Sequence, residues 1–229
     1  MSVSTARPVA DRRGTSPPPR ERILAAAREL FYRRGIHAVG VDAIAEAAGT
    51  NKMTLYRHFA SKDVLIAACL GELTREFDVA WDAIAAAHVG DPEGQLMAWL
   101  RHVCDFKENE AERGCALANA AIELPDKDHP ARRVIREHKT AHRERLISLC
   151  RDARLADPER LADEIFLIWE GARVTAQSVG SQGLSSRLAE MLEALVADHA
   201  RRGKRGELHG QARAGVDRGV KLAEQGPNS

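Results

Sequence analysis

The sequence predicts an all-α protein of about nine helices, in which a small three-helix head at the N-terminal end precedes a larger helical domain. Alanine is conspicuously abundant, and it has the highest helix propensity of all residues. Apolar residues recur at three- and four-residue spacing through most of the chain, and no segment shows the sustained period-two alternation of a half-buried strand. At 229 residues, with 44% of them hydrophobic, the chain can bury a core without disulfide or metal support.

Cap and breaker residues divide this pattern into elements. Ser61 can cap a long helix, and Asp91-Pro92 and Asp157-Pro158 each place a capping Asp before a proline in the first turn. Gly35 and Pro125 end helices. The expected helices cover, in order, residues 20–34, two short stretches within 41–59, 61–87, a stretch from 92, 112–124, a long stretch from 130, 158–179 and 185–201.

Composition divides the chain into four regions. We expect a disordered basic arm rich in Pro, Ser and Arg (1–19), a helix-turn-helix domain (20–66), a larger helical domain (67–202) and a glycine-rich disordered tail (203–229). Residues 1–62 carry eleven Lys and Arg against five Asp and Glu, although the net charge of the whole chain is only +1. A basic end on an acidic body suits a protein that touches a polyanion with one part.

The most informative segment is VDAIAEAAGTNKMTLYRHF, residues 41–59. Gly49 tolerates the left-handed backbone at the end of a first helix, and Asn51 is a good N-cap for a second. In that second helix Leu55 and Phe59, four residues apart, can pack inward. The outer face then carries groups that can reach bases and phosphates in a major groove, namely Lys52, Met53, Thr54, Tyr56, Arg57 and His58. This pattern predicts a helix-turn-helix DNA-binding protein.

From Arg22 to about Leu70 the chain resembles the tetracycline-repressor (TetR) family of bacterial transcription regulators. The resemblance is carried by ILAAARELFYRRG, by LYRHF and by the following SK. It implies that Tyr56, His58 and Lys62 contact phosphates mainly, and that Lys52, Met53, Thr54 and Arg57 lie nearest the bases. Two positions depart from the family pattern. Gly40 replaces the usual capping Thr or Ser, and Met53 replaces a small residue.

A weaker resemblance, in RGCALANAAIEL and DHPARRVIREHK, extends to the ligand-binding region of the family. A few large or polar side chains stand among many alanines there, and we expect five of them to line an effector pocket: Trp99, Phe106, Asn119, Glu123 and Trp169. Plain core packing, or for the two polar residues a dimer contact, is the alternative. No cationic side chain recurs on the apolar stripes, so we expect a hydrophobic or aromatic effector rather than a sugar phosphate.

A function of a different class is also open, that of a small all-α enzyme or a metal or redox sensor using His102, Cys104 and Cys115. However, His102 and Cys104 would diverge by roughly 200° on a helix. The four cysteines show no CxxC spacing, which favours free thiols in a reducing compartment. No nucleophile–base motif or phosphate-binding loop is present, so we expect no catalytic site, no cofactor and no metal.

The expected partners are a double-stranded DNA operator, a small-molecule effector and a second copy of the chain. The resemblance implies that the last two helices form a four-helix bundle with a symmetry mate, so a charge at Leu192 or Leu195 is expected to yield monomers. Two-fold symmetry would match an inverted-repeat operator. We expect the protein to be a repressor that binds this operator and is released from it by the effector. No segment approaches 18 apolar residues, and no signal peptide is seen. We therefore expect a soluble, cytoplasmic protein with no membrane partner.

Overall fold

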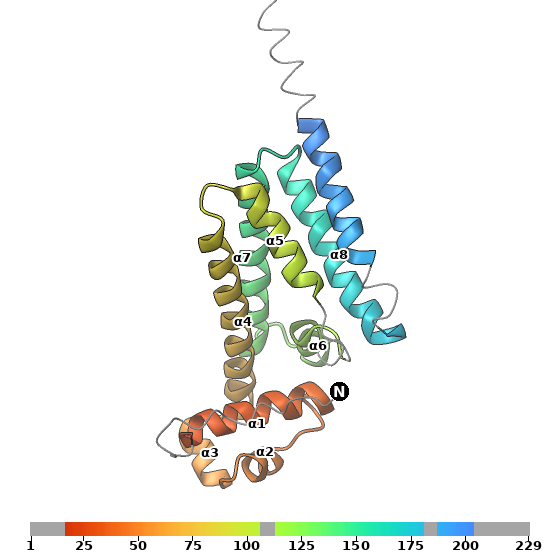
Figure 1. The fold of residues 1–229 in the computed structure, drawn as a ribbon. Helices are drawn as coiled ribbons and strands as arrows, with labels where there is room; N and C mark the ends of the chain where they lie inside the picture. Colours follow the sequence, from red (N-terminus) through yellow and green to blue (C-terminus); the bar gives the residue numbers. More distant parts are fainter. Residues whose placement is uncertain (1–16, 106–112, 181–186, 204–229) are drawn as a thin grey trace, which may run out of the picture.

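The computed structural model describes residues 17–105, 113–180 and 187–203, and every regular element within them is a helix. The predicted all-α fold is confirmed. The helices are α1 (Pro19–Arg34), α2 (Val41–Ala47), α3 (Lys52–His58), α4 (Lys62–Ala87), α5 (Pro92–Cys104), α6 (Ala116–Glu123), α7 (Pro130–Asp152) and α8 (Pro158–Val179), followed by a last helix over residues 187–203. Figure 1 shows α1–α3 gathered at one end as a head, with the longer helices forming a body beyond it.

The head is built as the caps and apolar spacing predict. Ile23, Ile44 and Leu55, one from each of its helices, are fully buried against one another in a single core cluster. Gly49 has a φ of +61°, in the left-handed region, and so closes α2 without strain on a side chain. The Asn51 side chain accepts a hydrogen bond from the Thr54 backbone N–H at 2.9 Å, which caps α3.

The long helix α4 joins the head to the body. Ser61 caps it by accepting from the Val64 N–H at 3.1 Å, and the helix then runs for 26 residues. The Arg28 guanidinium of α1 donates to both carboxylate oxygens of Glu76 on α4, at 2.6 and 2.7 Å. The expected domain boundary between residues 66 and 67 falls inside this continuous helix (Figure 1).

A second contact between head and body is made by α6. The Glu123 carboxylate, on the last residue of α6, accepts the backbone N–H groups of Ile36 at 2.6 Å and His37 at 3.1 Å. The His37 ring in turn donates through Nε2 to the Glu123 carbonyl oxygen at 2.6 Å. Gly35 permits this approach, because a Cβ there would lie 3.1 Å from the carboxylate and its φ is +86°. The turn between α1 and α2 is therefore fixed to α6.

The hydrophobic residues form two core clusters, and the first of them also joins the head to α6. The cluster centred on the head continues into α6 through Leu117 and Ala120, and into the start of α7 through Ala131 and Ile135. A second cluster fills the body between α4, α5, α7, α8 and the last helix. The division between the two cores thus runs through the expected second domain, with α6 on the head's side.

A histidine lies within the body core. His142 on α7 is only 6% exposed, and four aromatic rings have their centroids within about 6 Å of its own: Trp81, Trp99, Phe166 and Trp169. Burial lowers the pKa of His142 to about 4, with the charges of nearby His138, Lys139 and Arg145 acting in the same direction. Burial also lowers the pKa of His138. Both rings are therefore neutral at pH 7.

Two expectations about helix starts need correction, and a third start is capped in a way that the sequence did not specify. Helix α6 begins at Ala116 and not near residue 112, since Arg113–Cys115 are not helical. Asp157 occupies the N-cap position of α8 but makes no side-chain cap bond, because its backbone is left-handed, with a φ of 48°. The cap of α7 is the His129 ring, whose Nδ1 accepts from the Ala131 N–H at 3.1 Å. Three expected features lie wholly or mostly outside the described residues: the basic arm, the start of the helix expected from Ser185, and the tail.

The faces of the last two helices also differ from expectation. Leu192 is fully buried in the core of its own chain, and Leu195 is partly buried against that core. A charge at Leu192 would therefore disrupt the body itself, and this part of the interface prediction was wrong. Outward-facing apolar residues on these helices include Leu167 and Val174 on α8 and Met191 on the last helix, which are 70%, 56% and 54% exposed. None of the described helices is both long and apolar enough to cross a membrane.

The first prediction tests the Glu123 contact. Glu123→Ala should destabilise the protein by about 1–3 kcal/mol in chemical denaturation, because it leaves the Ile36 and His37 N–H groups without their acceptor. Hydrogen exchange should show loss of protection at those two amides. Glu137→Ala, at an exposed carboxylate of α7, is the control and should change stability by less than about 0.5 kcal/mol. Unchanged protection of Ile36 and His37 in the Glu123 variant would contradict the assignment.

The second prediction concerns pH. Between pH 6.5 and about 4 the unfolded chain protonates at position 142 and the folded chain does not, so acidification favours unfolding. Lowering the pH from 7.5 to 5 should cost about 2 kcal/mol of unfolding free energy through this group. His142→Gln should flatten that part of the stability profile, whatever its effect at pH 7.5. Asp163→Asn is the control, because the Arg143 hydrogen bond keeps the pKa of the Asp163 carboxyl below its ordinary value, out of this window. An equal slope in the His142 variant would refute the prediction.

Candidate functional site

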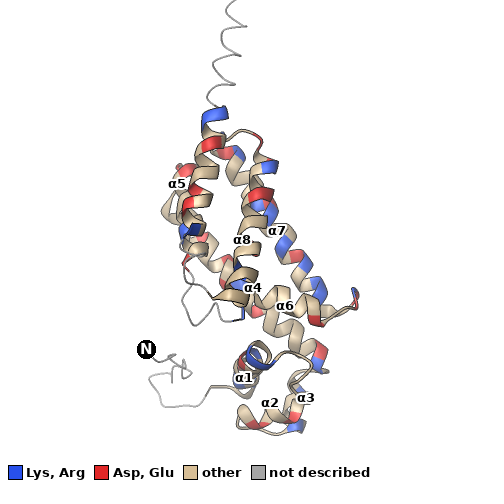
Figure 2. Ribbon diagram, turned by 90° about the vertical axis from the view of Figure 1, so that its right-hand side faces the viewer, with Lys and Arg blue, Asp and Glu red and all other residues tan. Residues whose placement is uncertain are grey.

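One candidate site is the outer face of α3. Leu55 is fully buried and Phe59, just after the helix, is 2% exposed, so these two residues anchor it as predicted. The opposite face is open to solvent and carries Lys52, Met53, Tyr56, Arg57 and His58, with Thr54 half-buried beside its cap. Met53 is 84% exposed although it is apolar. Figure 2 shows the charged residues of the head, with basic segments on α1 and at the α3 end.

Two of the lysines expected here already have partners. Lys52 pairs with Asp42 of α2 at 3.1 Å, an exposed contact worth at most about 1 kcal/mol. Lys62 donates to the Ile36 carbonyl at 2.6 Å, and its ammonium lies 5.8 Å from the centre of the Phe31 ring. Lys62 therefore also helps to hold the turn between α1 and α2. Gly40 is the N-cap residue of α2 and, lacking a side chain, makes no cap bond, as its departure from the family pattern implies.

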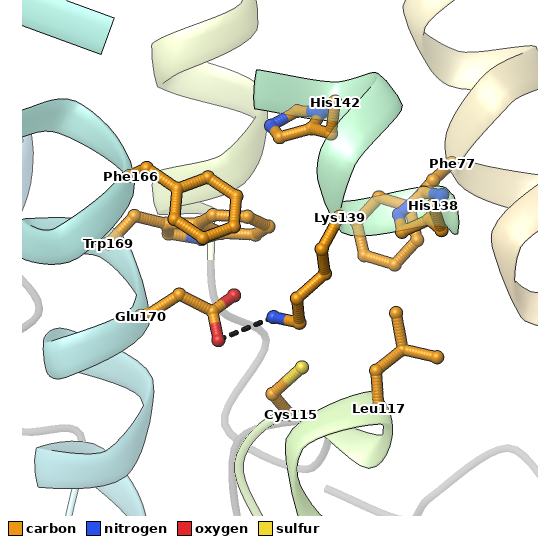
Figure 3. A pocket seen from close by; sticks show the side chains of 9 residues that line it. All are labelled: Phe77, Cys115, Leu117, His138, Lys139, His142, Phe166, Trp169 and Glu170. Carbon is orange, nitrogen blue, oxygen red and sulfur yellow. Dashed lines mark ion pairs between the residues drawn. The ribbon is translucent and has the colours of Figure 1, made fainter. Parts of the chain in front are cut away.

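A second candidate site is a pocket in the body between α4, α6, α7 and α8. Figure 3 shows the nine side chains that line it: Phe77, Cys115, Leu117, His138, Lys139, His142, Phe166, Trp169 and Glu170. The space open to the centre of a water molecule is about 10 Å³, which is about what one water needs. In this conformation the pocket is therefore closed around its own side chains.

The five residues expected to bind a ligand do not lie together in the structure. Trp169 lines the pocket, whereas Trp99 lies behind it, edge-on to Trp81 at 4.8 Å between ring centroids. Phe106 lies outside the described residues. Asn119 donates to the Arg113 carbonyl, and Arg113 donates to the Arg33 carbonyl of α1, so Asn119 supports the contact of α6 with the head. Glu123 serves that contact directly and does not line the pocket.

The pocket holds charged and polar groups that sequence reasoning missed. Lys139 pairs with Glu170 at 2.6 Å, so the expectation that cationic side chains occupy only the outer faces was wrong at Lys139. His142 is not evident from the sequence, because the preceding Ala141 also fits the apolar stripe of α7; in the structure Ala141 is exposed and His142 is buried. The spacing of His138 and His142, four residues apart and in line with Leu146, was the signal available.

Three polar atoms in the pocket region are buried and accept or donate no hydrogen bond within the described ranges. They are His142 Nε2, Trp169 Nε1 and Glu170 Oε1. The indole N–H can only donate and the carboxylate oxygen can only accept. Buried groups of this kind are normally satisfied, so the pocket offers both a donor and an acceptor to a molecule that enters it.

The residues of the alternative function do not form a site. His102 is exposed on α5 beside Trp99, while Cys115 lies at the start of α6 in the wall of the pocket. Burial raises the pKa of the Cys104 thiol to about 11, which keeps it protonated and unreactive. Among the residues that the structure describes, no three His, Cys, Asp or Glu side chains are grouped so as to hold a metal ion.

Family profiles match both parts of the chain. Residues 23–69 match the bacterial regulatory proteins of the tetR family, and residues 92–192 match the tetracyclin repressor-like C-terminal domain. Together the two matches span more than half of the chain. The second match covers α5–α8 and every residue that lines the pocket except Phe77 of α4.

Solved structures of whole proteins agree with these matches. SCO4454, a TetR-family transcriptional regulator from Streptomyces coelicolor, superposes with a TM-score of 0.72 at 28% identity over 79% of this chain and 95% of its own. The regulator sav143 from Streptomyces avermitilis superposes with a TM-score of 0.64 at 30% identity over 80% and 99% of the two chains.

A curated relative is the HTH-type transcriptional activator FasR of Mycolicibacterium smegmatis, which is 49% identical over 107 residues. That match covers 44% of this chain and 48% of FasR, so the chain spans about half the length of this relative. The profiles, the superpositions and the exposed face of α3 agree with one another. The chain belongs to the TetR family of DNA-binding transcriptional regulators.

Proposed function

We propose that this regulator is a dimeric repressor that binds an inverted-repeat operator through α3 and is released from it by a small hydrophobic or aromatic effector. The observation that carries the proposal is the position of α6. Its first residues line the pocket and its last residue holds the turn between α1 and α2. A change in the pocket therefore has a direct mechanical path to the head. The protein is expected to act in the cytoplasm, without catalytic activity.

For operator binding, the face of α3 supplies contacts of two kinds. Lys52, Met53, Thr54 and Arg57 are proposed to face base edges, with the Met53 side chain suited to apolar contact with a thymine methyl group. Tyr56, His58 and Lys62 are proposed to contact phosphates. The free backbone N–H groups in the first turn of α4, where Lys62 stands, favour an anion there. Phosphate contacts position the head, and base contacts select the sequence.

The effector response is proposed to follow from α6. A ligand that parts α7 from α8 presses on Cys115 and Leu117 at the start of α6, and Glu123 transmits the shift to the head. The separation of the two recognition helices then changes. The affinity for DNA falls by a factor equal to the ratio of the ligand's affinities for the released and the DNA-binding conformations. FasR is named an activator, so the sign of regulation is tested separately, by a promoter fusion measured with and without this protein.

The dimer is proposed to form on the exposed face of α8 and the last helix. Leu167, Gly171 and Val174 follow one another at four- and three-residue spacing and are all exposed. Gly171 has nothing within 4 Å of where a Cβ would lie, so a partner helix can approach closely there. Such a stripe is typical of helix bundles between subunits. Two-fold symmetry would then present two α3 helices to one side of a DNA duplex.

The third prediction concerns DNA. The wild-type protein should select a short inverted repeat, with affinity falling steeply as salt rises. Arg57→Ala should cost about 1–3 kcal/mol and relax the preference at one base pair in each half-site. Lys62→Ala should weaken all sequences alike, and its folding must be checked because Lys62 donates to the Ile36 carbonyl.

The control for these variants is Arg101→Ala, at an exposed position of α5, which should leave DNA binding unchanged. Binding would be measured by fluorescence anisotropy on fragments selected by the purified protein. Selection of no duplex at all, or binding insensitive to salt, would refute the operator proposal.

The fourth prediction concerns assembly. Leu167→Glu should give a folded monomer by light scattering and lose operator binding, because it places two charges in the two-fold interface. Val79→Glu, an equally exposed apolar position on α4, should leave the dimer intact. A wild-type monomer at micromolar concentration would refute the dimer, whereas a dimeric Leu167 variant would show that the interface lies elsewhere.

A further inference from the structure

The pocket is filled from within by Lys139. Figure 3 shows the Lys139 side chain running through the centre of the ring of lining residues, with its ammonium turned toward Glu170. The ammonium is 2.6 Å from Glu170 Oε2, and it also lies 5.4 Å from the centre of the Phe166 ring. The lysine thus takes the two contacts that an amine in this pocket would take, an ion pair and an aromatic face.

The aromatic walls of the pocket already accept cations at two places. Besides Lys139 over Phe166, the Arg173 guanidinium lies 5.6 Å from the centre of the Trp169 ring. The face of an aromatic ring carries partial negative charge and attracts cations, most strongly where water is excluded. These walls would give an anion no comparable stabilisation.

Glu170 supplies the second argument. Its Oε2 is paired with Lys139, but its Oε1 is buried and accepts no hydrogen bond from the residues described. An unsatisfied charged oxygen is among the costliest groups to bury. A primary or secondary ammonium has several N–H donors and could satisfy both oxygens. A neutral group has no charge with which to replace the lysine, and an anionic group has a charge of the wrong sign.

We propose that the effector is a hydrophobic organic amine whose ammonium pairs with Glu170 and displaces Lys139 from the pocket. This inference rests on the proposed function, because it takes the pocket as the effector site. The exchange conserves charge, since one cation leaves as another enters. Lys139 has a long side chain that is 24% exposed, so it can turn outward to water. Its departure opens the closed space to the hydrophobic part of the ligand, beside Leu117 and Cys115 of α6.

The test uses three probes of similar size that differ in one group: 2-phenylethylamine, 2-phenylethanol and 3-phenylpropanoate. Binding to the full-length protein would be measured by calorimetry and by thermal shift, which reports affinity for the folded state. The amine should bind at least tenfold more tightly than the alcohol, and the carboxylate should bind weakest. Glu170→Gln should reduce amine affinity about tenfold or more, because the charge-assisted contact is lost.

Lys139→Met provides the decisive variant. Removing the internal competitor should strengthen amine binding, whereas a pocket that uses Lys139 to bind an acid would lose its ligand. Asp163→Asn, which removes a different ion pair between α7 and α8, is the matched control and should bind the amine as the wild type does. Preference for the carboxylate, or no amine binding by both the wild type and the Lys139 variant, would overturn the proposal.

Release of operator DNA is measured separately from binding of the probe, by adding each probe to the complex of the protein with its operator. Amine binding without release would leave the ligand class standing and refute the proposed effector response. Operator binding by a protein that takes no amine would refute the ligand class alone.

Discussion

The contact between α6 and the turn after α1 determines how the two parts of this regulator relate. A single carboxylate, that of Glu123, accepts two backbone N–H groups of that turn, and the glycine before them leaves room for it. Around this contact the core of the head extends through Leu117 and Ala120 into α6. The head is therefore connected to the body by α6 as well as by α4. It is held at two places, and one of them is the short helix that also borders the pocket.

The closed pocket follows from a balance of charge in an apolar setting. Lys139 and Glu170 neutralise each other at 2.6 Å, and aromatic rings and neutral histidines surround them. A largely buried pair of this kind contributes little to stability, because desolvation offsets most of its attraction. It is costly to leave one member alone, however, so any molecule that replaces one partner must supply the same charge. This constraint is the physical reason for the proposed preference for a cationic ligand.

Local physics explains why most helices were predictable and where prediction failed. Caps such as Asn51 and Ser61 act within three residues, so their pattern in the sequence was enough. Asp157 failed because Asp also tolerates the left-handed backbone that the turn between α7 and α8 requires. His142 was missed because a buried histidine and an exposed alanine next to it give almost the same stripe as the reverse.

The sequence by itself determined the all-α fold, the recognition helix and its outer face, because each depends on spacing along one helix. Only the tertiary structure decided which large residues meet. Trp169 lines the pocket while Trp99 backs it, and Glu123 serves the head although its spacing suited a ligand. Leu192 likewise faces its own core and not a partner. Periodicity shows which side of a helix is buried, but the neighbour that buries it comes from elsewhere in the chain.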